Sequence, residues 1–100
     1  MDIFTMQQNA DHASALLKTM ANPSRLLVLC ALVTREHTVG ELEKLVGLSQ
    51  SAVSQHLARL RAEKIVTTRR EGQSVYYSLS NDNAKSILET MHGIYCEELD

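Results

Sequence analysis

The chain has 100 residues, of which 44% are hydrophobic, and this length supports one globular domain, residues 1–100, without a second core. No apolar run approaches the about 20 residues that cross a bilayer, and the N-terminal stretch lacks a signal-peptide pattern. We therefore expect a cytoplasmic protein with no membrane partner. The net charge of −2 gives no overall basic footprint. The charge is segregated, however: residues 56–74 carry five basic and two acidic side chains, whereas residues 81–100 carry one basic and five acidic ones.

Two helices are predicted in the first third of the chain. Apolar residues recur at helical spacing over 6–20, which predicts the first helix. Pro23 suits the first turn of a second helix, because its missing N–H would be unpaired there, and Asn22 is the expected N-cap. The second helix is expected to end near Thr34 and to be largely buried through one apolar stripe. That stripe consists of Leu26, Leu29, Cys30 and Val33. The thiol of Cys30 is therefore expected on the buried side.

A helix-turn-helix is predicted next. Apolar side chains at helical spacing among charged ones predict a short third helix over 39–46. Gly47 can adopt the left-handed conformation that closes a helix, and Ser49 can cap the following one. A short helix, a turn that contains glycine and a second helix with one polar face are typical of the DNA-binding helix-turn-helix.

The fourth helix, over 49–62, is the candidate for reading DNA. Val53, Leu57 and Leu60 fall on one stripe, and short polar side chains occupy the opposite face. Hydroxyl and amide groups can approach base edges in the major groove and can both donate and accept there. The candidate DNA-binding residues of this helix are Ser49, Gln50, Ser51, Ser54, Gln55 and Arg59. The alternative is an ordinary amphipathic helix with an exterior rich in serine and glutamine.

A β-hairpin is predicted over 65–79, where the periodicity changes from helical to alternating. Two segments rich in β-branched and aromatic residues flank Glu71-Gly72-Gln73, a turn whose glycine suits a positive φ. Arg69 and Arg70 make the tip cationic, so the hairpin is expected to act as a wing that touches phosphate or the minor groove. The alternative is a solvated hairpin whose charges prevent pairing at its edge.

The final helix is expected to begin after Asn81 as its N-cap and to carry a broad apolar surface as far as Tyr95. The helix-turn-helix and one hairpin cannot cover this surface and the first helix as well. We therefore expect the first and last helices to form a homodimer across a two-fold axis, which would set two reading helices ~34 Å apart on operator DNA. The alternative is a monomer in which these two helices cover each other.

The predicted fold is mainly α, with the element order ααααββα of a winged helix-turn-helix. Four sequence segments carry a resemblance to the ArsR-type winged-helix repressors. They are residues 21–26, 39–42, 48–57 and 75–79, which read ANPSRL, VGEL, LSQSAVSQHL and VYYSL. The resemblance covers nearly the whole chain and implies a homodimeric transcriptional regulator that binds double-stranded operator DNA. Its affinity for the operator would respond to a ligand or a redox event.

Two effector sites of that family are broken in this sequence. The arsenic-type site needs a Cys-x-Cys pair in the third helix, where residues 41–46 contain no thiol. The zinc-type site needs Asp-x-His in the last helix, followed further along by a histidine and a carboxylate. Here Ala84 stands two residues after Asp82, and the later position falls at Tyr95. The remaining pair, Cys30 and Cys96, resembles the sulfane-sulfur and redox-sensing branch of the family, whose effector is sulfane sulfur or an oxidant.

The chemistry of these two cysteines supports more than one role. Cys30 also suits a passive place in the core, because a buried thiol behaves as a small hydrophobe, whereas Cys96 is expected to be partly exposed. A reactive pair needs one thiolate to attack and a second to resolve the product. Glu97, Glu98 and the helix C-terminus would raise the pKa of Cys96, and only His92 could lower it. Which cysteine attacks first stays open.

We interpret the chain as a regulator that releases DNA when Cys30 and Cys96 form a sulfur bridge. One alternative is a metal-responsive repressor that uses both cysteines and His92 with a carboxylate, although two sulfurs and one histidine are a thin ligand set for zinc. Another is an anti-repressor or adaptor without thiol sensing. We expect no enzyme, because no Cys-x-x-Cys and no strand-to-helix site is visible, and we expect neither a cofactor nor a bound metal.

Overall fold

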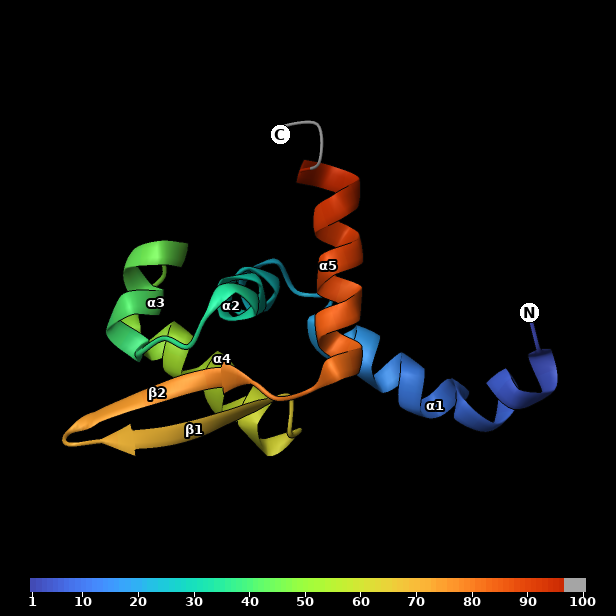
Figure 1. Cartoon of the computed structure of the whole chain (residues 1–100), viewed down its shortest axis with the longest axis horizontal. Coiled ribbons are helices and arrows are strands. Elements are labelled where there is room, and N and C mark those ends of the chain that lie inside the picture. The colour runs from blue at the N-terminus through green and yellow to red at the C-terminus, as the bar shows by residue number, and fades with distance from the viewer. Residues whose placement is uncertain (97–100) are drawn as a thin grey trace.

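The computed structural model describes residues 1–96 and folds as helices with one antiparallel hairpin (Figure 1). The elements are α1 Ile3–Met20, α2 Pro23–Thr34, α3 Val39–Val46, α4 Gln50–Ala62, β1 Val66–Glu71, β2 Ser74–Leu79 and α5 Asp82–Cys96. This order confirms the mainly α winged helix-turn-helix that the sequence predicts.

The ends of the helices follow from their capping residues. The Asn22 side chain accepts a hydrogen bond from the Arg25 backbone at 3.0 Å, with Pro23 at the first helical position. Gly47 closes α3 with a φ of 70°, in the left-handed region. α1 begins three residues before its expected start, because the Asp2 carboxylate accepts from the Thr5 backbone and caps it. Apolar periodicity alone does not detect that exposed first turn.

The hydrophobic core lies where α2, α4, the base of the hairpin and α5 meet. Its buried members are Met20, Val28, Leu29, Leu32, Leu42, Val53, Leu57, Leu60, Ile65, Val66, Ala84 and Leu88. The expected stripe of α2 is wrong in part: Leu29 is buried, but Val28 and Leu32 are its buried companions, and Cys30 is exposed. Because residues 26–33 of α2 are all apolar or thiol side chains, their spacing does not define which face is buried.

The hairpin consists of two paired strands, and one isolated backbone bridge joins it to the segment before α3. Val66 to Glu71 pair with Leu79 to Ser74, so the turn is reduced to Gly72-Gln73, with Gly72 at a φ of 62°. Ile65, expected in the first strand, precedes it, since its N–H donates to the Leu60 carbonyl at 2.9 Å. On the other edge, the backbones of His37 and Tyr77 exchange hydrogen bonds of 3.0 and 2.8 Å.

α1 and the wing extend in opposite directions from this core, and α5 leaves it in a third direction (Figure 1). Both helices expose large apolar side chains, which the single chain does not cover. On α1 these are Ile3, Phe4, Met6 and Leu17, and on α5 they are Met91, Ile94 and Tyr95. The alternative in which the two helices cover each other within one chain therefore does not account for their apolar surface.

Within residues 1–96, no single helix is long and apolar enough to cross a membrane. Only α1 and α2 taken together reach the required length and composition, and these two helices are bent by 95° relative to each other.

The buried stripe of α4 makes a direct prediction about stability. Leu57 is fully buried, so Leu57→Ala should lower the free energy of unfolding by about 2–5 kcal/mol, through lost burial and the cavity left behind. Leu45→Ala is the matched control, because Leu45 is 60% exposed, and it should change stability by no more than about 0.5 kcal/mol. Urea denaturation followed by circular dichroism measures both. Equal losses in the two variants would contradict the assigned core.

Candidate nucleic-acid interface and thiol pocket

The first half of α4 presents a row of exposed polar side chains. Val53, Leu57 and Leu60 are fully buried, which turns the opposite face of the helix toward solvent. Three of the predicted DNA-binding residues, Ser51, Ser54 and Gln55, lie away from the buried stripe with exposed side chains, and Gln50 is exposed as the first residue of the helix. A polar side chain that is exposed at the start of a helix can reach base edges in a groove.

Ser49 is exposed and is also the N-cap of α4. Its hydroxyl oxygen accepts a hydrogen bond from the Ala52 backbone at 3.2 Å and so caps α4, as the sequence predicts. The hydroxyl of Ser51 lies 3.3 Å from that of Ser49. The first turn of α4 is therefore ordered by its own side chains before any partner binds.

The C-terminal end of α4 is tied to α1. Arg59 donates to the carboxylate of Glu63 at 3.0 Å, and the buried hydroxyl of Thr19 donates to the same carboxylate at 2.6 Å. The Thr19 hydrogen bond and then Arg59 hold the pKa of Glu63 below its ordinary value. Burial, together with Arg25 and Arg59, lowers the pKa of His56, which favours the neutral imidazole. Sequence reasoning missed the Thr19–Glu63 contact, because 44 residues separate its partners.

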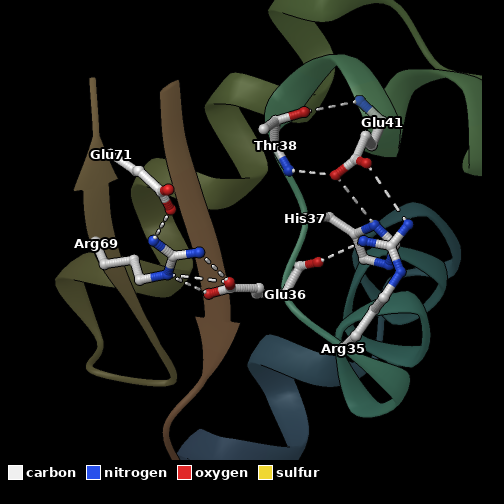
Figure 2. A network of polar contacts seen from close by, with 7 residues as sticks. All are labelled: Arg35, Glu36, His37, Thr38, Glu41, Arg69 and Glu71. Atoms are coloured by element: carbon white, nitrogen blue, oxygen red, sulfur yellow. Dashed lines mark hydrogen bonds and ion pairs between the residues drawn. The ribbon is translucent and has the colours of Figure 1, made fainter. Parts of the chain in front are cut away.

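The two arginines of the wing differ in their surroundings. Figure 2 shows the Arg69 guanidinium between the carboxylates of Glu36 and Glu71, with N···O distances of 2.9 and 2.7 Å. Its central carbon also lies 4.5 Å from the centre of the Tyr76 ring. Arg70 is exposed and has no ion pair or hydrogen-bonded side chain among residues 1–96. The cationic tip that the sequence predicts is thus neutralised at one position and available at the other.

The segment between α2 and α3 links the wing to the helix-turn-helix. Thr38 and Glu41 form a reciprocal capping box at the start of α3, which Figure 2 shows beside the Arg69 network. This interaction and Arg35 hold the pKa of Glu41 below its ordinary value. His37 is buried, and its Nδ1 atom lies 3.5 Å from Glu41 without a hydrogen-bond partner. The sequence pattern marked this segment only as a break between helices.

Cys30 lies on the side of α2 that faces α5, and Cys96 is the last residue of α5. Partial desolvation raises the pKa of the Cys30 thiol above its ordinary value, and the charge of nearby Cys96 raises it further. Cys30 borders a cavity of about 310 Å³, which Val33, Thr34, Leu88, Glu89 and His92 also line. Cys96 is half-buried at the end of α5. Glu97 and Glu98, which the sequence analysis placed beside Cys96, lie outside the described residues.

The described part of the chain holds no group of three histidine, cysteine or acidic side chains arranged to bind a metal ion. His92 does border the cavity of Cys30, where the metal-responsive alternative needs it. That alternative therefore lacks a complete ligand set within residues 1–96.

The chain is similar to bacterial transcription regulators in both sequence and structure. A family model described as bacterial regulatory protein, arsR family, matches residues 22–68. The transcriptional activator HlyU of Vibrio cholerae is 47% identical over 97 residues, covering 97% of this chain and 90% of HlyU. The crystal structure of the transcriptional repressor BigR from Xylella fastidiosa has a TM-score of 0.91 at 38% identity, covering 96% of this chain and 98% of BigR. Reduced HlyU from Vibrio cholerae N16961 has a TM-score of 0.86 at 49% identity, covering 92% and 97%.

These relatives include an activator and a repressor, and both are regulators of transcription rather than enzymes. The identity extends over nearly the whole of each chain, and the fold agrees in the order and arrangement of its elements. The resemblance drawn from the four sequence segments is therefore confirmed. The chain belongs to the bacterial ArsR family and is a winged helix-turn-helix DNA-binding regulator of transcription.

Proposed function

We propose that the chain is a homodimeric, cytoplasmic repressor that reads operator DNA with the first half of α4 and releases it when Cys30 and Cys96 form a sulfur bridge. The observation that carries the DNA-reading part is the exposure of Ser51, Ser54 and Gln55 opposite a fully buried apolar stripe. These side chains offer hydroxyl and amide groups, which can pair with base edges in the major groove.

The uncovered apolar side chains of α1 and α5 support the dimer. Phe4 on α1 and Tyr95 on α5 are 71% and 68% exposed, although each is a large apolar or aromatic group. A two-fold axis that pairs these helices would bury both surfaces and place two copies of α4 about one helical turn of DNA apart, roughly 34 Å. The operator would then be a palindrome or nearly so.

The position of Cys30 beside His92, one helical turn before Cys96 on α5, supports the thiol response. One thiolate attacks the outer sulfur of a persulfide donor, takes that sulfur as its own persulfide and releases the donor as a thiol. The second thiolate then attacks the inner sulfur and displaces hydrogen sulfide, which leaves a disulfide between α2 and α5. The donor is reduced by two electrons and the two protein thiols are oxidised by two. A bridge there would tie α2, which packs beneath the helix-turn-helix, to the dimer helix α5.

The DNA-reading proposal predicts a loss that depends on base sequence. Ser54→Ala and Gln55→Ala should each weaken binding to a duplex that the wild-type protein selects from a random pool by about 1–3 kcal/mol. Binding to a scrambled duplex should change little, because phosphate contacts remain. Ser86→Ala, which removes an exposed hydroxyl from α5, is the control. Fluorescence anisotropy measures the affinities, and equal binding of all variants to the selected duplex would refute this role of α4.

The thiol proposal predicts that substitution of either cysteine abolishes the response to a polysulfide donor without weakening DNA binding. Cys30→Ser and Cys96→Ser should bind the selected duplex like the wild type but should no longer release it when a polysulfide donor is added. Mass spectrometry of the treated wild type should find a peptide pair joined through Cys30 and Cys96. A Cys30→Ser protein that still releases DNA on treatment would end this proposal.

The pKa of Cys30 predicts how its reactivity changes with pH. Because the pKa is raised above the ordinary thiol value of 9.0, the thiol is protonated at neutral pH, and its rate of alkylation by iodoacetamide should still be rising at pH 9. Removing the neighbouring charge with Cys96→Ser should lower the pKa and increase this rate in the alkaline range. Peptide mass spectrometry at several pH values gives the rate at Cys30. A plateau below pH 9 would contradict the raised pKa of Cys30, and no effect of Cys96→Ser would contradict the contribution of the Cys96 charge to it.

A further inference from the structure

The two adjacent arginines of the wing project to opposite faces of the hairpin, since side chains alternate along a strand. Arg69 lies opposite Tyr76 in the strand pairing, so both side chains are on one face of the hairpin. Glu71, two residues after Arg69 on the same strand, is on that face as well. Arg70 pairs with Val75 on the other face. The same charge at neighbouring positions thus has two different environments.

Arg69 is surrounded by negative charge. Its Nε atom donates to both oxygens of Glu36, its Nη2 atom donates to Glu36 as well, and its Nη1 atom donates to Glu71. One guanidinium with two carboxylates has a net charge of −1. The hydrogen bonds from Arg69 also hold the pKa of Glu36 below its ordinary value, so this carboxylate stays ionised at neutral pH. Such a group repels a phosphate rather than attracting it.

The same contacts give Arg69 a mechanical role. The central carbon of its guanidinium lies over the Tyr76 ring on β2. The same guanidinium reaches Glu36, which precedes α3 in the chain (Figure 2). The next residue, His37, pairs with Tyr77 through both backbone hydrogen bonds, and Thr38 caps α3. Arg69 therefore joins the outer strand of the wing to the segment that begins the helix-turn-helix. This tie sets the direction of the wing relative to α3 and α4.

We propose that Arg69 is a positioning residue that holds the wing against the segment before α3, and that Arg70 alone of the two supplies the charge that contacts the DNA backbone. This division rests on the proposed DNA-binding function. Arg70 is exposed near the hairpin turn and has no carboxylate partner within the described residues. Its guanidinium is thus available for a phosphate oxygen, whereas that of Arg69 would first have to leave Glu36 and Glu71.

The salt dependence of DNA binding separates the two roles, because each phosphate contact adds about 0.9 to the slope of log affinity against log salt. Arg70→Gln should flatten the slope by about 0.9 per bound protomer. Arg69→Gln should leave the slope unchanged but weaken binding to the selected duplex about threefold to tenfold. Arg69→Lys should lose as much affinity as Arg69→Gln, since lysine keeps the charge but cannot make the forked contact. Adding Glu36→Gln to Arg69→Gln should cost nothing further, because both changes break one tie.

Lys85→Gln is the matched control for losing one positive charge. Lys85 lies in the first turn of α5, which follows the hairpin and is far along the chain from its turn. The loss of this charge should not change the slope. Fluorescence anisotropy over a range of salt concentrations gives the slopes, and thermal unfolding shows that each variant is folded. A flattened slope in Arg69→Gln that Arg69→Lys restores, or an unchanged slope in Arg70→Gln, would overturn the division. A wild-type protein that does not bind duplex DNA would instead overturn the proposed function, and this inference with it.

Discussion

The burial of Val53, Leu57 and Leu60 beneath α4 is the constraint on which the rest of the structure depends. These three side chains are fully buried and lock one face of the helix to the core formed by α2, the hairpin base and α5. The opposite face must then be exposed along its whole length. A regulator that reads DNA needs such a helix, because the side chains that meet the bases have to be presented by a rigid support.

Polar ties set the orientation of the elements around this helix. Thr19 and Glu63 connect the end of α4 to the end of α1, while Glu36 and Arg69 connect the wing to the start of the helix-turn-helix. Both ties join segments that are far apart in the sequence.

Local signals predicted much of this molecule. The caps at Asn22 and Ser49, the left-handed Gly47 and the hairpin that turns at Gly72 depend on residues a few positions apart, and the structure agrees with each of them. The predicted buried face of α2 is partly wrong, because a helix that is apolar on every side has no pattern that identifies the face it buries. Cys30 was misplaced for the same reason. The ion pair of Arg69 could not be predicted either, because Glu36 lies 33 residues away in the sequence. The distribution of charge along the sequence therefore located the basic segment, but it did not identify which arginine in that segment lacks a carboxylate partner within the described residues.

The central claim is that the exposed start of α4 is the surface that meets DNA. The most direct measurement is an NMR titration of the ¹⁵N-labelled protein with the duplex that it selects. We predict that the backbone amides of residues 49–55 and of the hairpin turn show the largest chemical-shift changes, with smaller changes around the cavity beside Cys30. Shifts confined to α1 and α5, with residues 49–55 unaffected at saturating DNA, would contradict the account.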